Sequence, residues 1–129
     1  MQTVYPVLKY KDDHAAIDFL EKAFGFERSS VHEGESGGVA HAELRFGDEF
    51  VMLGSTGEGK ELFNQGAGRT SVYLVVDDPD ERYERAKSAG AEIVMELTDQ
   101  DYGSRDFTVR DPEGNLWSFG TYGPTSNGS

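Results

Sequence analysis

Cysteine is absent from the chain, so disulfides, thiolate metal sites and a cysteine nucleophile are all excluded. No apolar run approaches the ~20 residues needed to span a bilayer. The first residues also show no basic region leading into the apolar stretch of a secretory signal. We therefore expect a cytoplasmic protein without a membrane partner.

Basic residues are scarce: 12 Lys and Arg stand against 24 Asp and Glu, which gives a formal net charge of −12. Nucleic acids are bound through clustered Lys and Arg, so nucleic acid is not an expected partner. An acidic protein attracts cationic small molecules, but acidity more commonly serves solubility. Charge alone therefore identifies no ligand.

Several common catalytic motifs are also missing from the sequence. It contains no Ser–His–Asp ordering, no P-loop and no dinucleotide glycine fingerprint. The glycine-rich segment Gly34–Gly38 falls in a predicted hairpin turn and does not open a helix, so it is not a phosphate cradle. Nucleotide binding and triad hydrolysis are thus not indicated.

A pattern is present twice, about 66 residues apart. Tyr5–Asp12 aligns with Ser71–Asp78 at the start of each copy, and Phe50–Gly54 aligns with Leu116–Gly120 at the end. At 129 residues the chain is too short for two independent cores, so the two copies must share one.

The first copy predicts a β-α-β-β-β order. Asp13 is placed to cap a helix whose apolar residues recur at helical spacing, and Gly25 ends that helix. The strands are predicted at Val4–Tyr10, Phe26–Val31, Val39–Phe46 and Glu49–Leu53.

The second copy predicts the same order, with Asp78 and Pro79 opening its helix. Its strands are predicted at Thr70–Val76, Ile93–Leu97, Arg105–Arg110 and Leu116–Tyr122. We expect one duplicated domain over residues 1–122, with unit one at 3–54, a connector at 55–68 that can act as a lid, and unit two at 69–122. Residues 123–129 are expected to form a disordered tail.

The duplicated unit, together with the segment Val109–Trp117 (VRDPEGNLW), resembles the vicinal oxygen chelate superfamily. That superfamily includes glyoxalase I, extradiol dioxygenases, fosfomycin-resistance enzymes and bleomycin-resistance proteins. The resemblance extends from Val4 to Tyr122. It implies an α+β fold in which two tandem β-α-β-β-β units form a curled mixed sheet with helices on the outer face.

The resemblance also locates the metal ligands of the metal-dependent members, at positions where the family normally has His or Glu. In this sequence those positions are Tyr5, Met52, Ser71 and Ser118. Neutral phenol, thioether and hydroxyl groups are poor ligands for a divalent ion. We therefore expect no metal and no cofactor.

What remains is most similar to the bleomycin-resistance branch, whose members confer antibiotic resistance by sequestering a ligand and are commonly dimers. This implies a homodimer that binds a small cationic or aromatic molecule in a concave cup. Another possible function for this fold is that of a regulatory or structural module whose cup is closed by its own side chains.

Strand alternation sorts the residues that face the cup from those that face the core. Val72, Leu74, Trp117 and Phe119 are predicted to be core residues, as are the alternate positions Ala40, Ala42 and Leu44. The predicted ligand-binding residues are Tyr5, His41, Glu43, Phe50, Met52, Ser71, Tyr73, Asp106, Thr108, Arg110 and Ser118.

His41 and Glu43 form the sharpest pair among these residues, since an imidazole and a carboxylate on one strand face can act as acid and base. Because of this pair, the alternative to a binding protein is an enzyme, either a glyoxalase-like lyase with a displaced metal site or a metal-free isomerase. The simpler reading is a set of surface ion pairs, with Glu43 pairing with Arg45 and Asp106 pairing with Arg110. Whether the protein is an enzyme stays open at this point.

Overall fold

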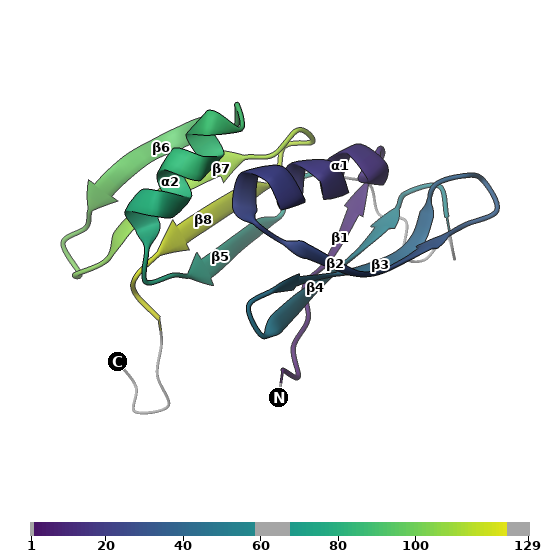
Figure 1. Ribbon diagram of the computed structural model, residues 1–129, viewed down its shortest axis with the longest axis horizontal. Helices are drawn as coiled ribbons and strands as arrows, with labels where there is room; N and C mark the ends of the chain where they lie inside the picture. Colours follow the sequence, from purple (N-terminus) through teal and green to yellow (C-terminus); the bar gives the residue numbers. More distant parts are fainter. Residues whose placement is uncertain (1, 59–67, 124–129) are drawn as a thin grey trace.

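A computed structural model describes residues 2–58 and 68–123 (Figure 1). It confirms the predicted α+β fold of two tandem units, each with the order β-α-β-β-β. The predicted curled sheet is present as two four-stranded mixed sheets. The strands are β1 (Val7–Tyr10), β2 (Glu27–Glu33), β3 (Val39–Phe46), β4 (Glu49–Ser55), β5 (Ser71–Val75), β6 (Glu92–Asp99), β7 (Arg105–Arg110) and β8 (Leu116–Gly120).

The two sheets have matching orders, β1-β4-β3-β2 and β5-β8-β7-β6. In each sheet the first and last strands of the unit pair in parallel, and the other pairs are antiparallel. Val7 pairs with Met52, and Tyr73 pairs with Ser118, each 66 residues further along the chain. The spacing of the sequence repeat is therefore also the spacing of the strand register.

Strand β1 begins at Val7, although the sequence favoured a start at Val4. The Gln2 side chain occupies the place of a strand residue, because it donates to the Phe50 carbonyl at 2.9 Å and accepts from the Phe50 amide at 2.6 Å. Pro6 has no amide hydrogen, and its carbonyl accepts from Met52 at 2.9 Å. The segment before Val7 is thus fixed to β4 without being a regular strand.

Helix α1 (Asp13–Phe19) continues into a π-helical stretch, Leu20–Phe24, which ends at Gly25 in the left-handed conformation, as predicted. The expected cap at Asp13 is wrong by one residue: Asp12 accepts from the Ala15 amide at 3.1 Å, and Asp13 is buried. Helix α2 (Pro79–Ser88) starts after Asp78 as expected, although the Asp78 carboxylate accepts from Arg82 at 3.2 Å instead of capping the backbone.

Of the core residues predicted in unit two, Trp117 and Phe119 are buried, and Val72 and Leu74 are half-buried against the same core. Ala42 and Leu44 are buried as predicted, but Ala40 is exposed. The cause is a bulge: His32 pairs with His41 and Glu33 with Val39, so Ala40 is the extra residue on β3 and loses its place in the alternation.

Aromatic side chains join the two units into one core. Phe24 at the end of the first helix lies 5.5 Å from Trp117 and 4.9 Å from Phe119, measured between ring centroids. Phe46 of β3 lies 6.4 Å from Phe119. Both helices lie on the same side of the two sheets, so within residues 2–58 and 68–123 no helix covers the opposite sheet faces (Figure 1).

The turn Asp111–Gly114 of the VRDPEGNLW segment holds the units together by hydrogen bonds. Buried Asp111 accepts from the Tyr10 hydroxyl at 2.6 Å and from the Trp117 indole at 3.0 Å. Glu113 accepts from the backbone amides of Lys11 and Asp12 at 2.7 and 2.8 Å. The VRDPEGNLW segment, which is the most specific part of the resemblance, therefore connects β1 and the start of α1 to unit two.

Among the described residues, no helix is long and apolar enough to cross a membrane. Most of the predicted connector and tail, residues 59–67 and 124–129, lies outside the described residues, and so does the prediction that the connector closes as a lid.

Candidate ligand-binding site

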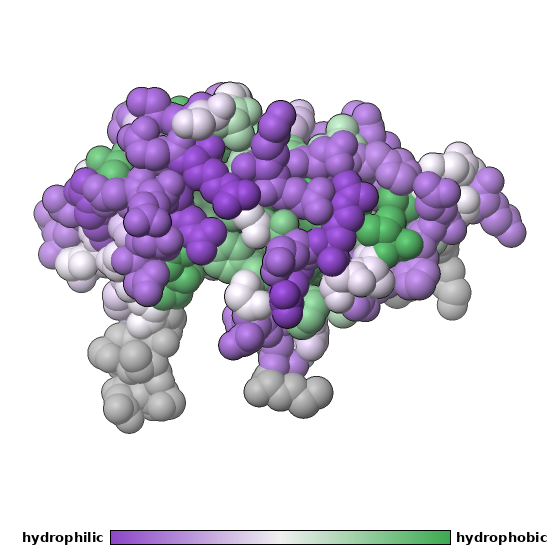
Figure 2. Space-filling view, viewed as in Figure 1, coloured by the Kyte–Doolittle hydropathy of each residue, from purple (hydrophilic) through white to green (hydrophobic). Residues whose placement is uncertain are grey.

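A cleft of about 330 Å³ lies between the two units. Its walls come from the segment before β1, from β4 and from the free edge of β5. The lining residues are Gln2, Val4, Pro6, Phe26, Phe46, Glu49, Phe50, Val51, Val72, Tyr73, Leu74 and Val75. Most of these side chains are apolar. On the face shown in Figure 2, apolar surface lies in the hollow between the units, and most of the other surface in view is hydrophilic.

Local structure explains why these apolar groups stay accessible. Strand β5 is an edge strand, so both its inner residues, such as Leu74, and its outer residues, such as Val75, reach the cleft. Val75 is 55% exposed and Tyr73 is 42% exposed, which is high for such side chains. Three polar groups, from Gln2, Glu49 and Tyr73, lie on an otherwise apolar lining, a composition typical of small-molecule sites.

Of the predicted ligand-binding residues, Phe50 and Tyr73 line this cleft. The remaining nine are not among the residues that line it. His41, Glu43 and Met52 belong to strands β3 and β4, and Asp106, Thr108, Arg110, Ser71 and Ser118 belong to the second sheet. Tyr5 precedes β1 and is half-buried.

The four positions that the resemblance assigns to metal ligands do not present a suitable donor set. The Ser118 and Thr108 hydroxyls bond to each other at 2.8 Å, and Met52 and Ser71 offer only a thioether and an exposed hydroxyl. Within residues 2–58 and 68–123, no three His, Asp or Glu side chains lie close enough to hold a metal ion. The chemistry of the side chains present does not fit a divalent ion.

His41 and Glu43 are in contact, with 3.0 Å between Nε2 and Oε2. Both side chains are about two-fifths exposed, and the His32 ring stacks beside His41 with a centroid separation of 6.4 Å. The anticipated pairing of Glu43 with Arg45 is wrong, because Arg45 bonds to Glu27 on the neighbouring strand at 2.8 Å. Arg110 likewise bonds to Glu92 at 3.3 Å and not to Asp106.

Asp106 belongs to a polar cluster on the face of the second sheet opposite helix α2, because its neighbour Phe107 is the residue that packs against Tyr83 of that helix. The buried carboxylate accepts from the Gln100 amide at 2.8 Å and from the Tyr102 hydroxyl at 3.1 Å. Desolvation and the bond to Asp106 raise the pKa of Tyr102. Tyr73 donates to the Tyr122 carbonyl at 2.7 Å. The sequence analysis selected Asp106 and Tyr73 as site residues but not Tyr102, Gln100 or Tyr122. Those three lie in the turn before β7 and just after β8, outside the strands to which alternation applies.

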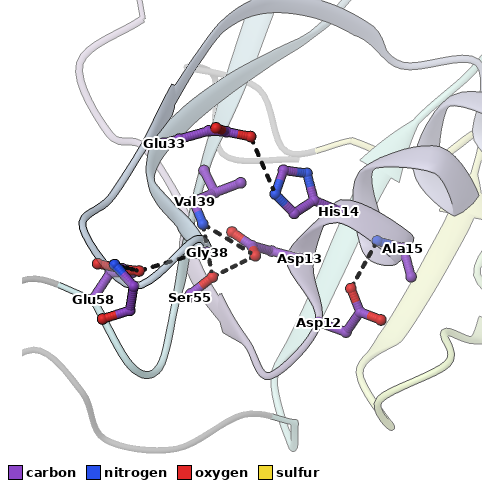
Figure 3. Close-up of polar contacts among 10 residues, drawn as sticks. Asp12, Asp13, His14, Ala15, Glu33, Gly38, Val39, Ser55 and Glu58 are labelled. Carbon is purple, nitrogen blue, oxygen red and sulfur yellow. Dashed lines mark hydrogen bonds and ion pairs between the residues drawn. The ribbon is translucent and has the colours of Figure 1, made fainter.

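A second buried network lies at the far end of β3 and β4 (Figure 3). The Asp13 carboxylate accepts from the Ser55 hydroxyl and, at 3.4 Å, from the Val39 amide. Its other oxygen is buried and has no hydrogen-bond partner among the described residues. Glu58 accepts from the amides of Ser36 and Gly38 at 3.0 and 3.1 Å. The sequence did not predict this network, since nothing in its pattern shows that Asp13 and Glu58 point inward.

Comparison with known proteins places this geometry in a family. The model of the Glyoxalase/Bleomycin resistance protein/Dioxygenase superfamily matches residues 4–119. The uncharacterized protein Rv0887c of Mycobacterium tuberculosis is 37% identical over 121 residues, covering 89% of this chain and 71% of that protein.

Two solved structures are similar to the whole chain. The crystal structure of TioX from Micromonospora sp. ML1 has a TM-score of 0.78 and 36% sequence identity, and the match covers 92% of this chain and 98% of TioX. A mutant of glyoxalase I from Zea mays has a TM-score of 0.73 at 20% identity; the match covers 97% of this chain and 47% of the plant enzyme. That second likeness concerns the fold alone. The family match over nearly the whole chain, supported by these relatives, shows that this protein belongs to the Glyoxalase/Bleomycin resistance protein/Dioxygenase superfamily.

Proposed function

We propose that the protein binds a small, largely apolar molecule in the cleft between its two units, without a metal ion. The observation that carries this proposal is the cleft itself, whose volume of about 330 Å³ falls within the usual range of small-molecule pockets. Phe50 and Tyr73 offer flat aromatic surface there, and the Glu49 carboxylate can orient a polar group.

The donor chemistry supports binding without a metal. Tyr5, Met52, Ser71 and Ser118 replace the family's usual ligands, and the Ser118 hydroxyl already bonds to Thr108. A dication at this position would lose its hydration shell without gaining charged or imidazole ligands in return. A largely apolar organic molecule does not need charged or imidazole ligands in order to bind.

A direct test uses a neutral fluorescent probe, N-phenyl-1-naphthylamine, whose emission rises in apolar surroundings. The Val75→Trp variant fills the cleft from the exposed edge of β5, and we expect it to weaken probe binding about tenfold, equivalent to about 1.4 kcal/mol. Val94→Trp is the matched control, because Val94 is also an exposed valine on an edge strand of the same sheet but does not line the cleft. Equal probe affinity in the two variants would contradict the proposal.

Catalysis by His41 and Glu43 is the second candidate, and the 3.0 Å contact between them is the observation that favours it. Both side chains lie outside the cleft lining, so a ligand held in the cleft does not need them. His41→Ala should leave probe affinity within about twofold, a change of about 0.4 kcal/mol on the usual affinity scale. An activity in the wild type that disappears in this variant would instead identify an enzyme.

We also propose that two copies of the chain associate, as the resemblance implied. Strands β1 and β5 are edge strands, and Val7 on β1 is 61% exposed. Edge strands with apolar side chains are surfaces that pair readily with another chain.

A further inference from the structure

Asp106 is an acidic residue in an unusual position. It is only 3% exposed, yet among residues 2–58 and 68–123 its carboxylate accepts hydrogen bonds only from neutral donors, Gln100 and Tyr102. The neighbouring Arg105 points elsewhere and bonds to Asp80 and Asp99. Buried carboxylates usually have a cationic partner or a full set of donors, and Asp106 has neither.

Asp111 provides a comparison within the same molecule. That buried carboxylate accepts from Tyr10, Trp117, the Asn115 side chain and the amides of Glu113 and Asn115. Such a donor set satisfies both oxygens, as expected for a structural residue. With one bond to each oxygen, Asp106 retains capacity for a further donor.

One tyrosine contacts the Asp106 carboxylate directly, and two others lie beside it: the Tyr102 hydroxyl donates to Asp106, Tyr122 packs on Tyr102, and the Tyr73 hydroxyl donates to the Tyr122 carbonyl. Tyr102 is 62% exposed, and its ring meets that of Tyr122 edge to face, with 5.9 Å between centroids. Gly120 allows Tyr73 to approach from the other side: a Cβ at that position would lie 2.5 Å from the Tyr73 hydroxyl and 2.8 Å from the Asp106 Cβ. Tyr73 and Asp106 are therefore held close together over β8, which no larger residue would permit.

A carboxylate bonded to an exposed tyrosine, with a second exposed tyrosine packed on the first, is suited to one class of ligand. Aromatic faces attract organic cations, and a carboxylate accepts hydrogen bonds from an ammonium group. A divalent metal ion would require more charged oxygen or imidazole ligands than these residues provide. The net charge of −12 adds a long-range attraction for cations.

We propose that Asp106, Tyr102 and Tyr122 bind the ammonium group of an organic amine whose apolar part lies in the cleft. Tyr73 connects the two regions, because it lines the cleft and its hydroxyl reaches the Tyr122 carbonyl. This inference rests on the proposed function and gives its ligand a chemical class. On binding, the ammonium replaces the Tyr102 hydroxyl as a donor to Asp106, so a charged donor takes the place of a neutral one.

The experiment compares 1-naphthylmethylamine with 1-naphthalenemethanol, which share an aromatic body and differ in an ammonium or a hydroxyl group. Binding is measured by calorimetry at neutral pH in about 0.15 M salt, where the Debye length of about 8 Å limits the effect of distant charges. We expect the amine to bind about tenfold more tightly than the alcohol.

Three variants test the origin of that preference. Asp106→Asn should reduce the amine's affinity to that of the alcohol and leave the alcohol unchanged. Asp101→Asn is the matched control, since it removes the same charge from an exposed position in the adjoining turn. Tyr102→Phe removes the competing hydroxyl but keeps the ring, so it should increase the amine preference several-fold, and it tests the site without altering the buried carboxylate.

The outcomes separate the two proposals. If the alcohol binds and the amine shows no preference, or if Asp101→Asn weakens the amine as much as Asp106→Asn, the amine site is wrong and the apolar cleft stands. An unchanged preference in Tyr102→Phe would also overturn the amine site. If neither compound binds, both proposals fail.

Discussion

Tyr10 donates its hydroxyl hydrogen to a buried carboxylate in the other half of the chain. Burial, followed by the negative charge of Asp111, raises the pKa of the Tyr10 hydroxyl above its ordinary value. The neutral form is therefore favoured in the folded state. The stabilisation is complete below a pH of about 10, where tyrosine in the unfolded chain ionises, and it is lost as the pH rises further.

Tyr10→Phe should therefore change both stability and its pH dependence. We expect a loss of about 1.5–3 kcal/mol at neutral pH, the usual value of a hydrogen bond to a charged group. Urea unfolding between neutral pH and a pH of about 10.5 should show a shallower alkaline decline than in the wild type. Tyr122→Phe, which changes an exposed tyrosine, is the control. If the free energy of unfolding falls equally with rising pH in the wild type and in Tyr10→Phe, the role given to Tyr10 is wrong.

Gly38 lies where a side chain cannot fit. A Cβ at this position would be 2.6 Å from the Ser55 hydroxyl oxygen and 3.3 Å from the Glu58 Cγ. Gly38→Ala should lower the free energy of unfolding by about 1–3 kcal/mol, as overpacking commonly does. Gly57→Ala meets no atom of the described part of the chain within 4 Å and should change stability by less than about 0.5 kcal/mol. Thermal unfolding of the two variants distinguishes this crowding from a general cost of replacing glycine.

Single positions show how far the sequence could predict the site. Phe50 and Tyr73 were selected by strand alternation and do line the cleft. Asp106 was selected as well, but its burial depends on Gln100 and Tyr102, which a turn brings back over the sheet. Alternation within a strand contains no information about such a turn. Ala40 was misplaced for a related reason, because a bulge adds a residue without leaving a mark in the pattern.

At the level of elements, the turn between β2 and β3 is attached to the end of β4 by one carboxylate. Glu58 is buried and accepts from the amides of Ser36 and Gly38, so a residue beyond β4 fixes a turn more than 20 residues earlier (Figure 3). The strands themselves were predictable from alternation and turn residues. This attachment was not, since the sequence shows Glu58 only as one acid in a polar stretch.

Glu58→Gln should loosen the turn while leaving the strands in place. The amides of Ser36 and Gly38 both donate to the same Glu58 oxygen, and a neutral amide oxygen in its place is a weaker acceptor than a carboxylate oxygen. We expect hydrogen exchange at the Ser36 and Gly38 amides to accelerate about tenfold or more, with no matching change in β7. Glu35→Gln, an exposed acid in the same turn, should have little effect. Unchanged exchange at both amides would show that Glu58 does not hold the turn.

For the whole molecule, the contact between the units depends on a few polar bonds added to a shared aromatic core. Glu113 contributes two of them through the backbone amides of Lys11 and Asp12. Glu113→Ala should destabilise the protein by about 1–3 kcal/mol, and unfolding should remain a single transition because both units share one core. Glu35→Ala serves as the exposed control, and two separate transitions in Glu113→Ala would show that the units are independent.

Association of two copies is tested by sedimentation velocity. Val7→Lys places a charge on the exposed face of the β1 edge strand, a substitution that opposes pairing between edge strands. We expect it to shift the protein toward the monomer. Val94→Lys makes the same change on the edge strand β6 and should leave the distribution as in the wild type. The proposal fails if the wild type sediments as a monomer at all concentrations, or if both variants behave alike.

The parallel pairing of first and last strands also determines the order in which the chain can be assembled on the ribosome. Strand β1 has no partner strand until β4 has been synthesised, and β5 must in turn wait for β8. All four strands of the first sheet are translated before any strand of the second, because β4 ends at Ser55 and β5 begins at Ser71. The hydrogen bond from Tyr10 to Asp111 joins residues 101 positions apart, so it forms only after almost the entire protein has been made, and the core shared by the two units cannot be completed earlier.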